Sequence, residues 1–176
     1  MTTKKISAVQ KQFVPITSND KIVVIGGSAG GFAAVSQIIK NLPQTFDCPI
    51  FIVLHMPREA SGILPDNLNR VSHIYAAHAV DREIVCKNRI YVAPPDYHLI
   101  VEKNHVRVTK GPRENRFRPA IDPLFRSAAH SFQGRVIGLI LSGALDDGVA
   151  GLWAIKKYGG IAVIQDPREA EIPFMP

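Results

Sequence analysis

Short apolar runs alternate along the first half of the chain with stretches whose apolar residues recur every three or four positions. The runs at 21–25 and 49–54 have the length of buried strands, and the stretch 32–42 between them has the spacing of a helix buried on one face. A helical pattern at 62–70 and a short apolar run at 73–77 repeat this order. Strands that alternate with helices predict a parallel sheet with helices packed on its faces.

The pattern changes in the middle of the chain, where apolar and polar residues alternate one by one. This alternation covers 89–93, 97–101 and 105–109, and turn-forming residues separate the three segments at 94–96 and 103–104. A period of two indicates strands with one buried face. We therefore expect an antiparallel hairpin that is inserted into the parallel α/β pattern.

The last part of the chain returns to the alternation of helices and strands. Asp122 followed by Pro123 is typical of a helix start, with Asp122 as the N-cap and Pro123 as the first helical residue, and the helix is predicted to end near Phe132. The remaining predicted elements are a strand, a helix and a strand, at 136–141, 149–158 and 161–164. The whole pattern predicts one α/β domain, a three-layer, doubly wound and mostly parallel sheet with an antiparallel hairpin insert.

Length and composition fit this single domain. The chain has 176 residues, of which 46% are hydrophobic and 20% charged, and none of its apolar runs is long enough for a transmembrane helix. Residues 1–18 are polar and lack the apolar core of a secretion signal, so we expect a mobile leader ahead of a domain at 19–176. Cys48 and Cys86 form neither a disulfide framework nor a zinc-binding pattern, which favours a reduced, cytoplasmic protein.

The chain is basic, with a net charge of +6 and a pI near 9.5. Such a charge is compatible with nucleic acid, an anionic membrane or an acidic protein surface as the partner. The basic residues are scattered apart from Arg113, Arg116 and Arg118, and the sequence has no zinc-finger spacing and no basic strand with interleaved aromatic residues. These observations argue against nucleic-acid binding. The three arginines either attract an acidic partner or belong to a solvated loop.

Candidate chemistry lies where the predicted parallel strands end, because ligands of such sheets gather at the carboxyl edge. The loops at this edge are 26–31, 55–58 and 142–148. The first loop, GGSAGG, is similar to a dinucleotide-binding turn, but Ser28 replaces the middle glycine of that motif and the next strand ends in His55 instead of an acidic residue. These two departures make nucleotide binding the weaker alternative.

Gly26, Ser28 and Gly30 also match the G-x-S-x-G pattern, which presents a serine on a sharp turn between a strand and a helix. In that arrangement, the free N–H groups of the helix N-terminus can stabilise a tetrahedral oxyanion. Ser28 is equally compatible with a simple role as the hydroxyl that caps this helix. The turn by itself leaves nucleophile and cap open.

A serine nucleophile needs a base and a carboxylate that orients the base. His55 ends the neighbouring predicted strand, so it is the histidine best placed to be the base. Asp146 and Asp147 provide carboxylates in a third loop of the same edge, and their spacing does not say which of them faces His55. In α/β-hydrolases the acid precedes the histidine, so a triad in the order found here belongs to another α/β fold.

Five ordered blocks of the sequence resemble the catalytic domain of the chemotaxis protein-glutamate methylesterases, the CheB type. The resemblance extends from about Asp20 to Pro176. The blocks are IGGSAGG at 25–31, LHMP at 54–57, IYVAPPDYHL at 90–99, NRFRPAIDPLFRSAA at 115–129 and LSGALDDG at 141–148. Five blocks in this order are far more specific than any single motif.

The resemblance implies a triad with Ser28 as nucleophile, His55 as base and Asp147 as the acid, and it thereby selects Asp147 over Asp146. The implied reaction is hydrolysis of a glutamate methyl ester, with deamidation of glutamine as a second activity, and it needs no cofactor or metal. The implied partners are the cytoplasmic helices of methylated chemoreceptors, with no nucleic acid and no membrane insertion. The implied location is the cytoplasm.

The chain departs from the family pattern in three places. Members in chemotaxis typically carry an N-terminal receiver domain, whereas this chain has a short leader, and they continue past Phe174, Met175 and Pro176 into a further helix. We therefore expect a catalytic domain without a receiver domain and with a truncated C-terminus. In the last block, Ala144 and Leu145 replace the usual methionine and glycine, which bears on the substrate range. The alternative function is a non-catalytic regulatory module of the same fold that binds a receptor or another signalling partner.

Overall fold

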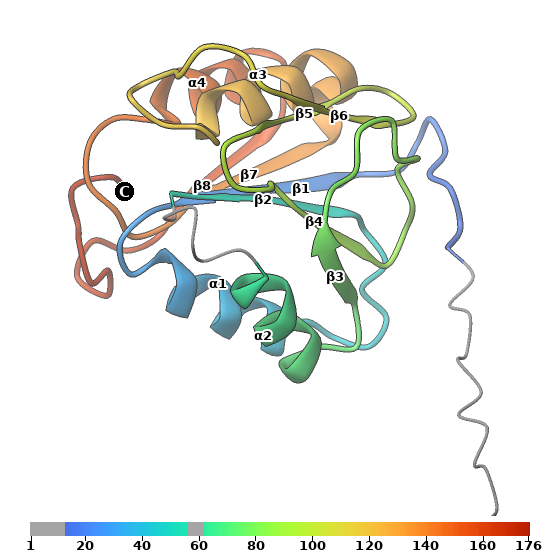
Figure 1. Ribbon diagram of the computed structural model, residues 1–176, viewed down its shortest axis with the longest axis horizontal. Helices are drawn as coiled ribbons and strands as arrows, with labels where there is room; N and C mark the ends of the chain where they lie inside the picture. The colour runs from blue at the N-terminus through green and yellow to red at the C-terminus, as the bar shows by residue number, and fades with distance from the viewer. Residues whose placement is uncertain (1–12, 56–61) are drawn as a thin grey trace, which may run out of the picture.

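The computed structural model describes residues 13–55 and 62–176, and Figure 1 shows how its elements are arranged. In chain order, the elements are β1 (Ile22–Gly27), α1 (Gly31–Lys40), β2 (Ile50–Leu54), α2 (Ile63–Val71), β3 (Tyr75–His78), β4 (Arg89–Val92), β5 (His98–Val101), β6 (Val106–Thr109), α3 (Ile121–Phe132), a short 3-10 turn (Gln133–Arg135), β7 (Val136–Ile140), α4 (Val149–Lys157) and β8 (Ile161–Ile164). Strands and helices alternate at both ends of the chain, as the hydrophobic pattern predicts.

A six-stranded sheet forms the middle layer of the molecule (Figure 1). Its strand order is β3-β4-β2-β1-β7-β8, and every neighbouring pair is parallel. Helices α1 and α2 cover one face, while α3, α4 and the separate antiparallel hairpin β5–β6 lie on the other. This architecture confirms the predicted three-layer α/β fold with an antiparallel hairpin insert.

The central strand β1 shows why the buried strands appear as continuous apolar runs in the sequence. All of its residues are buried, with Ile22 and Val24 in the core on the α3 face and Val23 and Ile25 in the core on the α1 and α2 face. Because both faces are covered, the strand has no polar side and does not alternate. It continues to Gly27, so the glycine turn begins directly at the carboxyl edge of the sheet.

The prediction for 89–93 is wrong, because β4 belongs to the parallel sheet and not to the hairpin. The polar residue that suggested a half-exposed strand, Arg89, is only 4% exposed. Its guanidinium lies over the rings of Tyr75 and Tyr91 and forms a salt bridge with Glu83 at 3.0 Å. A buried and paired arginine therefore imitates the polar face of an exposed strand. The hairpin consists of β5 and β6 alone.

The start of α3 also differs from the prediction. Ala120 occupies the N-cap position and Asp122 is the second residue of the helix, so Asp122 is not its cap and Pro123 is not its first residue. The Asp122 carboxylate instead accepts the N–H groups of Gly148 and Gly151, at 3.1 and 2.6 Å, at the start of α4. Because α3 and α4 lie side by side, the carboxylate caps the neighbouring helix (Figure 1).

Part of the predicted leader belongs to the described structure. Ile16 donates its N–H to the carbonyl of Val85 at 3.1 Å, so this part of the chain contacts the segment before β4. The rest of the predicted leader, 1–12, lies outside the described residues, and so do positions 56–58 of the second predicted site loop. Among the helices that the structure describes, none has the length and apolar character needed to cross a membrane.

Candidate active site

The three predicted site residues follow three neighbouring strands of the sheet. Ser28 comes directly after β1, His55 directly after β2, and Asp147 lies in the loop after β7. The N–H of His55 donates to the carbonyl of Gly27 at 3.1 Å, and the N–H of Ser28 donates to the carbonyl of Ser142 at 2.9 Å. Backbone hydrogen bonds thus fasten the three loops side by side at the carboxyl edge, where ligands of parallel sheets bind.

His55 and Asp147 form a hydrogen-bonded pair. Nε2 of His55 lies 2.7 Å from Oδ2 of Asp147, and the two side chains are 4% and 0% exposed. Because an ionised carboxylate can only accept, the neutral form of the His55 ring has its proton on Nε2 and a lone pair on Nδ1. Nδ1 is buried and has no hydrogen-bond partner in the part of the chain that the structure describes. It is therefore the nitrogen that is left to take a proton from a nucleophile.

The Asp147 carboxylate is surrounded by donors at the N-terminus of α3. In addition to His55, its Oδ2 accepts the N–H of Ile121 at 2.7 Å, while its Oδ1 accepts the N–H of Asp122 at 3.1 Å and Nδ2 of Asn115 at 2.8 Å. Burial by itself raises the pKa of the Asp147 carboxyl, but the hydrogen bonds outweigh burial and hold this pKa below its usual value. Asp147 thus stays negatively charged opposite the ring.

The neighbouring carboxylate, Asp146, takes no part in this arrangement. Asp146 is exposed, and its backbone carbonyl accepts the N–H of Val149 at the start of α4. Consecutive residues of an irregular loop point in different directions, which is why spacing in the sequence could not rank the two acids. Of the two, Asp147 is the one in contact with His55.

Ser142 holds the turn that presents Ser28. Its carbonyl accepts the Ser28 N–H, and its Oγ donates to the carbonyl of Ala29 at 2.7 Å and accepts the N–H of Ile172 at 2.9 Å. Gly30 follows with a φ of 79°, a conformation that favours glycine, and a Cβ at this position would collide with Oγ of Ser142. The glycine turn is thus locked against the loop that follows β7.

Ser28 is half-buried, and within the described residues it forms no hydrogen bond with His55. Gly143 lies against it, so closely that a Cβ added to this glycine would come within 2.8 Å of the Ser28 Cβ. The N–H of Ala29 has no acceptor among the described residues and is free to bind an oxyanion. Hydrogen bonds between a nucleophile and its base often tighten only when substrate binds, so this geometry is compatible with a nucleophilic Ser28.

Replacing Ser142 by alanine is expected to lower the free energy of unfolding by about 1–3 kcal/mol, because the Ala29 carbonyl and the Ile172 N–H lose a partner. Turnover should fall as well, since the turn that carries Ser28, the predicted nucleophile, is no longer fixed. Ser131→Ala is the matched control, because its Oγ donates to the Val101 carbonyl at the other end of α3. Denaturant unfolding and ester hydrolysis are measured on both variants. Equal turnover in the two would refute a role for Ser142 in the site.

Two of the three arginines in the basic loop ahead of α3 pair with other groups of the protein. Arg118 donates to Oδ1 of Asp96 at 2.7 Å and to the carbonyl of Gly111 at the same distance. Arg113 lies 3.7 Å from the same carboxylate, whereas Arg116 is exposed. Of the two interpretations that the sequence left open, Arg118 therefore fits a structural role in the loop.

Sequence reasoning missed the residues that surround the histidine–carboxylate pair. Asn115 contacts Asp147, and the ring of Phe117 stacks on that of His55. Asp122, expected only to cap its own helix, links α3 to α4. The one available signal was that all three residues lie just before or at the start of α3, whose N-terminus the predicted fold brings to the carboxyl edge. The residue types alone do not predict these contacts.

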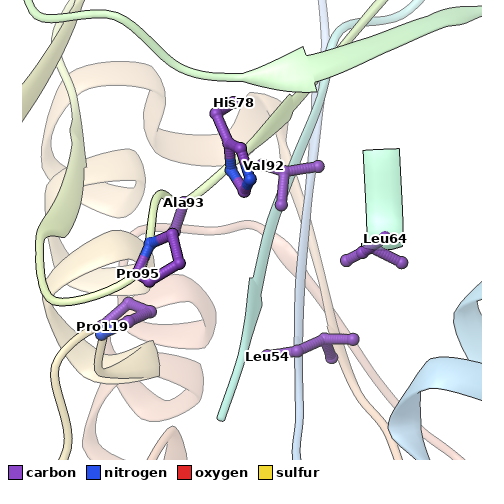
Figure 2. Close-up of a pocket in the computed structure, with 7 residues that line it drawn as sticks. All are labelled: Leu54, Leu64, His78, Val92, Ala93, Pro95 and Pro119. Carbon is purple, nitrogen blue, oxygen red and sulfur yellow. The ribbon is translucent and has the colours of Figure 1, made fainter. Parts of the chain in front are cut away.

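A small apolar pocket lies beside the site, where β2, β3 and β4 end (Figure 2). It is lined by Leu54, Leu64, His78, Val92, Ala93, Pro95 and Pro119. Its volume is about 20 Å³, close to the space that one water molecule needs. The pocket is therefore too small to hold a side-chain ester. Within residues 13–55 and 62–176, no group of three His, Cys, Asp or Glu side chains could hold a metal ion.

A parallel α/β sheet whose carboxyl edge carries a serine turn beside a histidine–carboxylate pair is typical of hydrolases with a serine nucleophile. The sequence model of the CheB methylesterase family matches residues 23–176. The chain belongs to this family and is an enzyme of the carboxylic ester hydrolase class.

Relatives and a solved structure agree with this assignment. A putative protein-glutamate methylesterase/protein-glutamine glutaminase from Leptospira interrogans is 42% identical over 90% of this chain and 82% of its own length. A protein-glutamate methylesterase/protein-glutamine glutaminase from Trichodesmium erythraeum is 38% identical over 92% of this chain, which spans about half of that relative (47%). The catalytic domain of the Thermotoga maritima CheB methylesterase superimposes with a TM-score of 0.86 at 35% identity, over 90% of this chain and 86% of that domain.

Proposed function

We propose that the chain removes the methyl ester from glutamate side chains in the cytoplasmic helices of methylated chemoreceptors, and that it also deamidates glutamine there. Ser28 is the nucleophile, His55 the base, and Asp147 the carboxylate that orients the base. The observation that carries the proposal is the 2.7 Å hydrogen bond between His55 and Asp147, next to the serine turn of a chain in the methylesterase family. The names of the relatives support glutamate and glutamine side chains as the targets.

The reaction begins with a tetrahedral intermediate between the enzyme and the substrate. Ser28 Oγ attacks the carbonyl carbon of the glutamyl ester while Nδ1 of His55 takes the hydroxyl proton. The ring becomes positively charged, and the ionised Asp147 stabilises that charge. The negative oxygen of the tetrahedral intermediate is stabilised by the N–H of Ala29, which has no acceptor within residues 13–55 and 62–176, and by the N-terminus of α1.

The remaining steps form the acyl-enzyme and then hydrolyse it, which restores the enzyme and releases glutamate. The bond between the carbonyl carbon and the methoxy oxygen breaks, and His55 gives its proton to this oxygen so that methanol leaves. A water molecule then attacks the acyl-enzyme while His55 takes one of its protons. The bond to Ser28 breaks, the serine recovers its proton, and the glutamate carboxylate is formed. With a glutamine side chain, ammonia takes the place of methanol as the leaving group.

The test is methanol release from the methylated cytoplasmic fragment of a chemoreceptor, with the unmethylated fragment as the blank. We expect methanol and free glutamate side chains in equal amounts. The alternative, a non-catalytic module, predicts that the chain binds the fragment without turnover. If the Thermotoga maritima catalytic domain released methanol in the same assay and this chain released none, the proposed function would be wrong.

A further inference from the structure

The loop before α3 contains a tight turn that no part of the proposed reaction uses. Glu114 and Phe117 pair across it, with N–H to carbonyl distances of 3.1 and 2.8 Å. The two central residues, Asn115 and Arg116, have φ values of 49° and 73°. Positive φ at both central positions is the geometry of type I′ hairpin turns, and asparagine is among the residues that adopt it most readily. The backbone of this turn, Glu114–Phe117, is therefore well defined by local chemistry.

The first central side chain bridges two buried carboxylates. Nδ2 of Asn115 lies 2.8 Å from Oδ1 of Asp147 and 2.8 Å from Oδ2 of Asp122. An amide nitrogen has two hydrogens, so each carboxylate receives one of them. The bridge lies between two carboxylates that would otherwise face each other, and it fixes the plane of the Asp147 carboxylate. The other oxygen of this carboxylate accepts the hydrogen bond from Nε2 of His55. Both carboxylates also depend on the amide for a hydrogen bond that compensates for their burial.

The last residue of the turn holds the histidine ring. The rings of Phe117 and His55 are stacked, with centroids 3.5 Å apart and planes inclined by 6°. The hydrogen bond to Asp147 fixes one edge of the imidazole, and the stack fixes its face. Together they leave the ring one orientation, in which Nδ1 has no partner among the residues that the structure describes. A ring held in this way is already oriented to take the serine proton, so no rotation of the ring has to precede the transfer.

The turn is in addition tied to the helix that carries the second carboxylate. Glu114 pairs with Arg126 of α3 at 2.6 Å, and Arg126 lies 3.9 Å from Oδ2 of Asp122. The turn, the start of α3 and the Asp147 loop are thus one connected unit at the carboxyl edge.

We propose that the turn Glu114–Phe117 is a positioning element, in which Asn115 sets the plane of the Asp147 carboxylate and Phe117 sets the plane of the His55 ring. Asn115 and Phe117 do not touch the reacting atoms, so they are positioning residues. The inference rests on the proposed function, because it assigns them to the base and acid of that reaction. The inference goes beyond the proposed function, because it places the control of the geometry of His55 and Asp147 in a loop outside the triad.

Two variants of Asn115 separate this role from the simple formation of a turn. Glycine and aspartate both accept a positive φ, so Asn115→Gly and Asn115→Asp keep the backbone of the turn. We expect Asn115→Gly to lower kcat about ten- to a hundredfold with little change in KM. The variant does not alter substrate binding, but it displaces the His55–Asp147 pair. Asn115→Asp should be slower still at neutral pH, because a third carboxylate then faces Asp122 and Asp147.

The pH profile gives a second readout. Asn115 is one of the donors that hold the pKa of the Asp147 carboxyl down, so its loss raises that pKa. The acid limb of kcat in Asn115→Gly is expected to move to higher pH relative to the wild type. The other charged or titratable groups that face this carboxylate are His55, Asp122 and, through Asp122, Arg126. These groups are unchanged in the variant.

The matched pair for the ring contact lies in the same turn. Phe117→Leu removes the stacked ring but keeps an apolar side chain, and it should lower kcat about tenfold. Arg116→Ala changes the neighbouring exposed residue, and alanine keeps a Cβ at this position of positive φ. The kcat of this variant should stay within about twofold of the wild type. A role of the turn in stability alone predicts that these two variants differ in unfolding but not in kcat.

A measurement on the ring itself distinguishes failure of this inference from failure of the proposed function. We expect the proton on Nε2 of His55 to give an NMR signal whose exchange with water is slowed by the hydrogen bond to Asp147. In the full chain, we expect faster exchange of this signal with water in Asn115→Gly and Phe117→Leu than in Arg116→Ala, whether or not the chain turns over receptor. An unchanged signal in all three variants, or Ser28-dependent turnover with wild-type kcat and acid limb in both Asn115 variants, would overturn the positioning role.

Discussion

Ser28→Ala is expected to lower kcat/KM for methanol release by roughly three orders of magnitude or more. The variant keeps the fold and the hydrogen bond from the Ser28 N–H to Ser142, because that bond uses the backbone. It loses only the oxygen that forms the acyl-enzyme in the proposed mechanism. Methanol release from methylated receptor fragment measures the effect, and a thermal unfolding curve verifies that the variant is folded.

Ser36→Ala is the matched control for this experiment. Ser36 lies in α1, the helix that follows the turn, and its Oγ bonds to the Phe32 carbonyl and to Asn67, away from the site. Its loss should cost some stability and leave kcat/KM within a few fold, about the effect of an ordinary substitution outside an active site. In the structure the N-cap of α1 is Gly30 and no side chain caps this helix, so the capping role that the sequence left open for Ser28 is not observed. Similar rates for Ser28→Ala and Ser36→Ala would show that Ser28 is not the nucleophile.

Asp147→Asn is expected to lower turnover about a thousandfold or more, whereas Asp146→Asn should leave it nearly unchanged. The carboxylate accepts from the His55 ring, from Asn115 and from the first N–H groups of α3. An amide has a single accepting oxygen, so its NH₂ group would face at least one of these donors. The substitution Asp147→Asn would also remove the negative charge opposite the imidazolium. Turnover of the two variants is compared on the same receptor fragment, and the reverse ranking would show that the acid is Asp146.

The same variant has a defined pH dependence of stability. The pKa of the Asp147 carboxyl is lowered by folding, so its contribution to stability is present above the unfolded pKa of about 3.9 and is lost as the pH falls through the folded value. The free energy of unfolding of the wild type should therefore be on the order of 1–3 kcal/mol higher than that of Asp147→Asn at neutral pH. This difference should become smaller in acid. Denaturant unfolding at several pH values measures this difference. A gap that widened in acid would mean that Asp147 is not held ionised by its donors.

Much of the fold could be predicted because its strands and helices bury apolar residues with different spacings along the chain. Strand β1 is covered on both faces and appears as an apolar run, while the one-sided burial of α1 gives its apolar residues a helical spacing. The prediction failed where a polar residue is buried with partners. Arg89 imitates an exposed face in β4, and Asp122 resembles an N-cap although it serves α4.

The candidate site could be predicted as far as chain topology determines it. Parallel strands bring Ser28, His55 and the Asp146 and Asp147 loop to one edge, but the direction of a side chain in an irregular loop depends on contacts from distant segments. Asn115 reaches Asp147 only because its turn lies against the start of α3. Such contacts have no periodicity in the sequence. The assignment of Ser28, His55 and Asp147 as a triad stays a prediction until the variants are measured.

If Ser28 is an activated nucleophile, a fluorophosphonate will react with it directly. The Ser28 oxygen forms a bond to phosphorus, the bond from phosphorus to fluorine breaks, and fluoride leaves, so that a stable adduct remains. Peptide mapping of the whole chain is expected to place the adduct on Ser28, with much slower labelling in Asp147→Asn and none at this position in Ser28→Ala. A Ser28 peptide that stayed unmodified while the reagent labelled a different residue, or no residue, would contradict the serine mechanism.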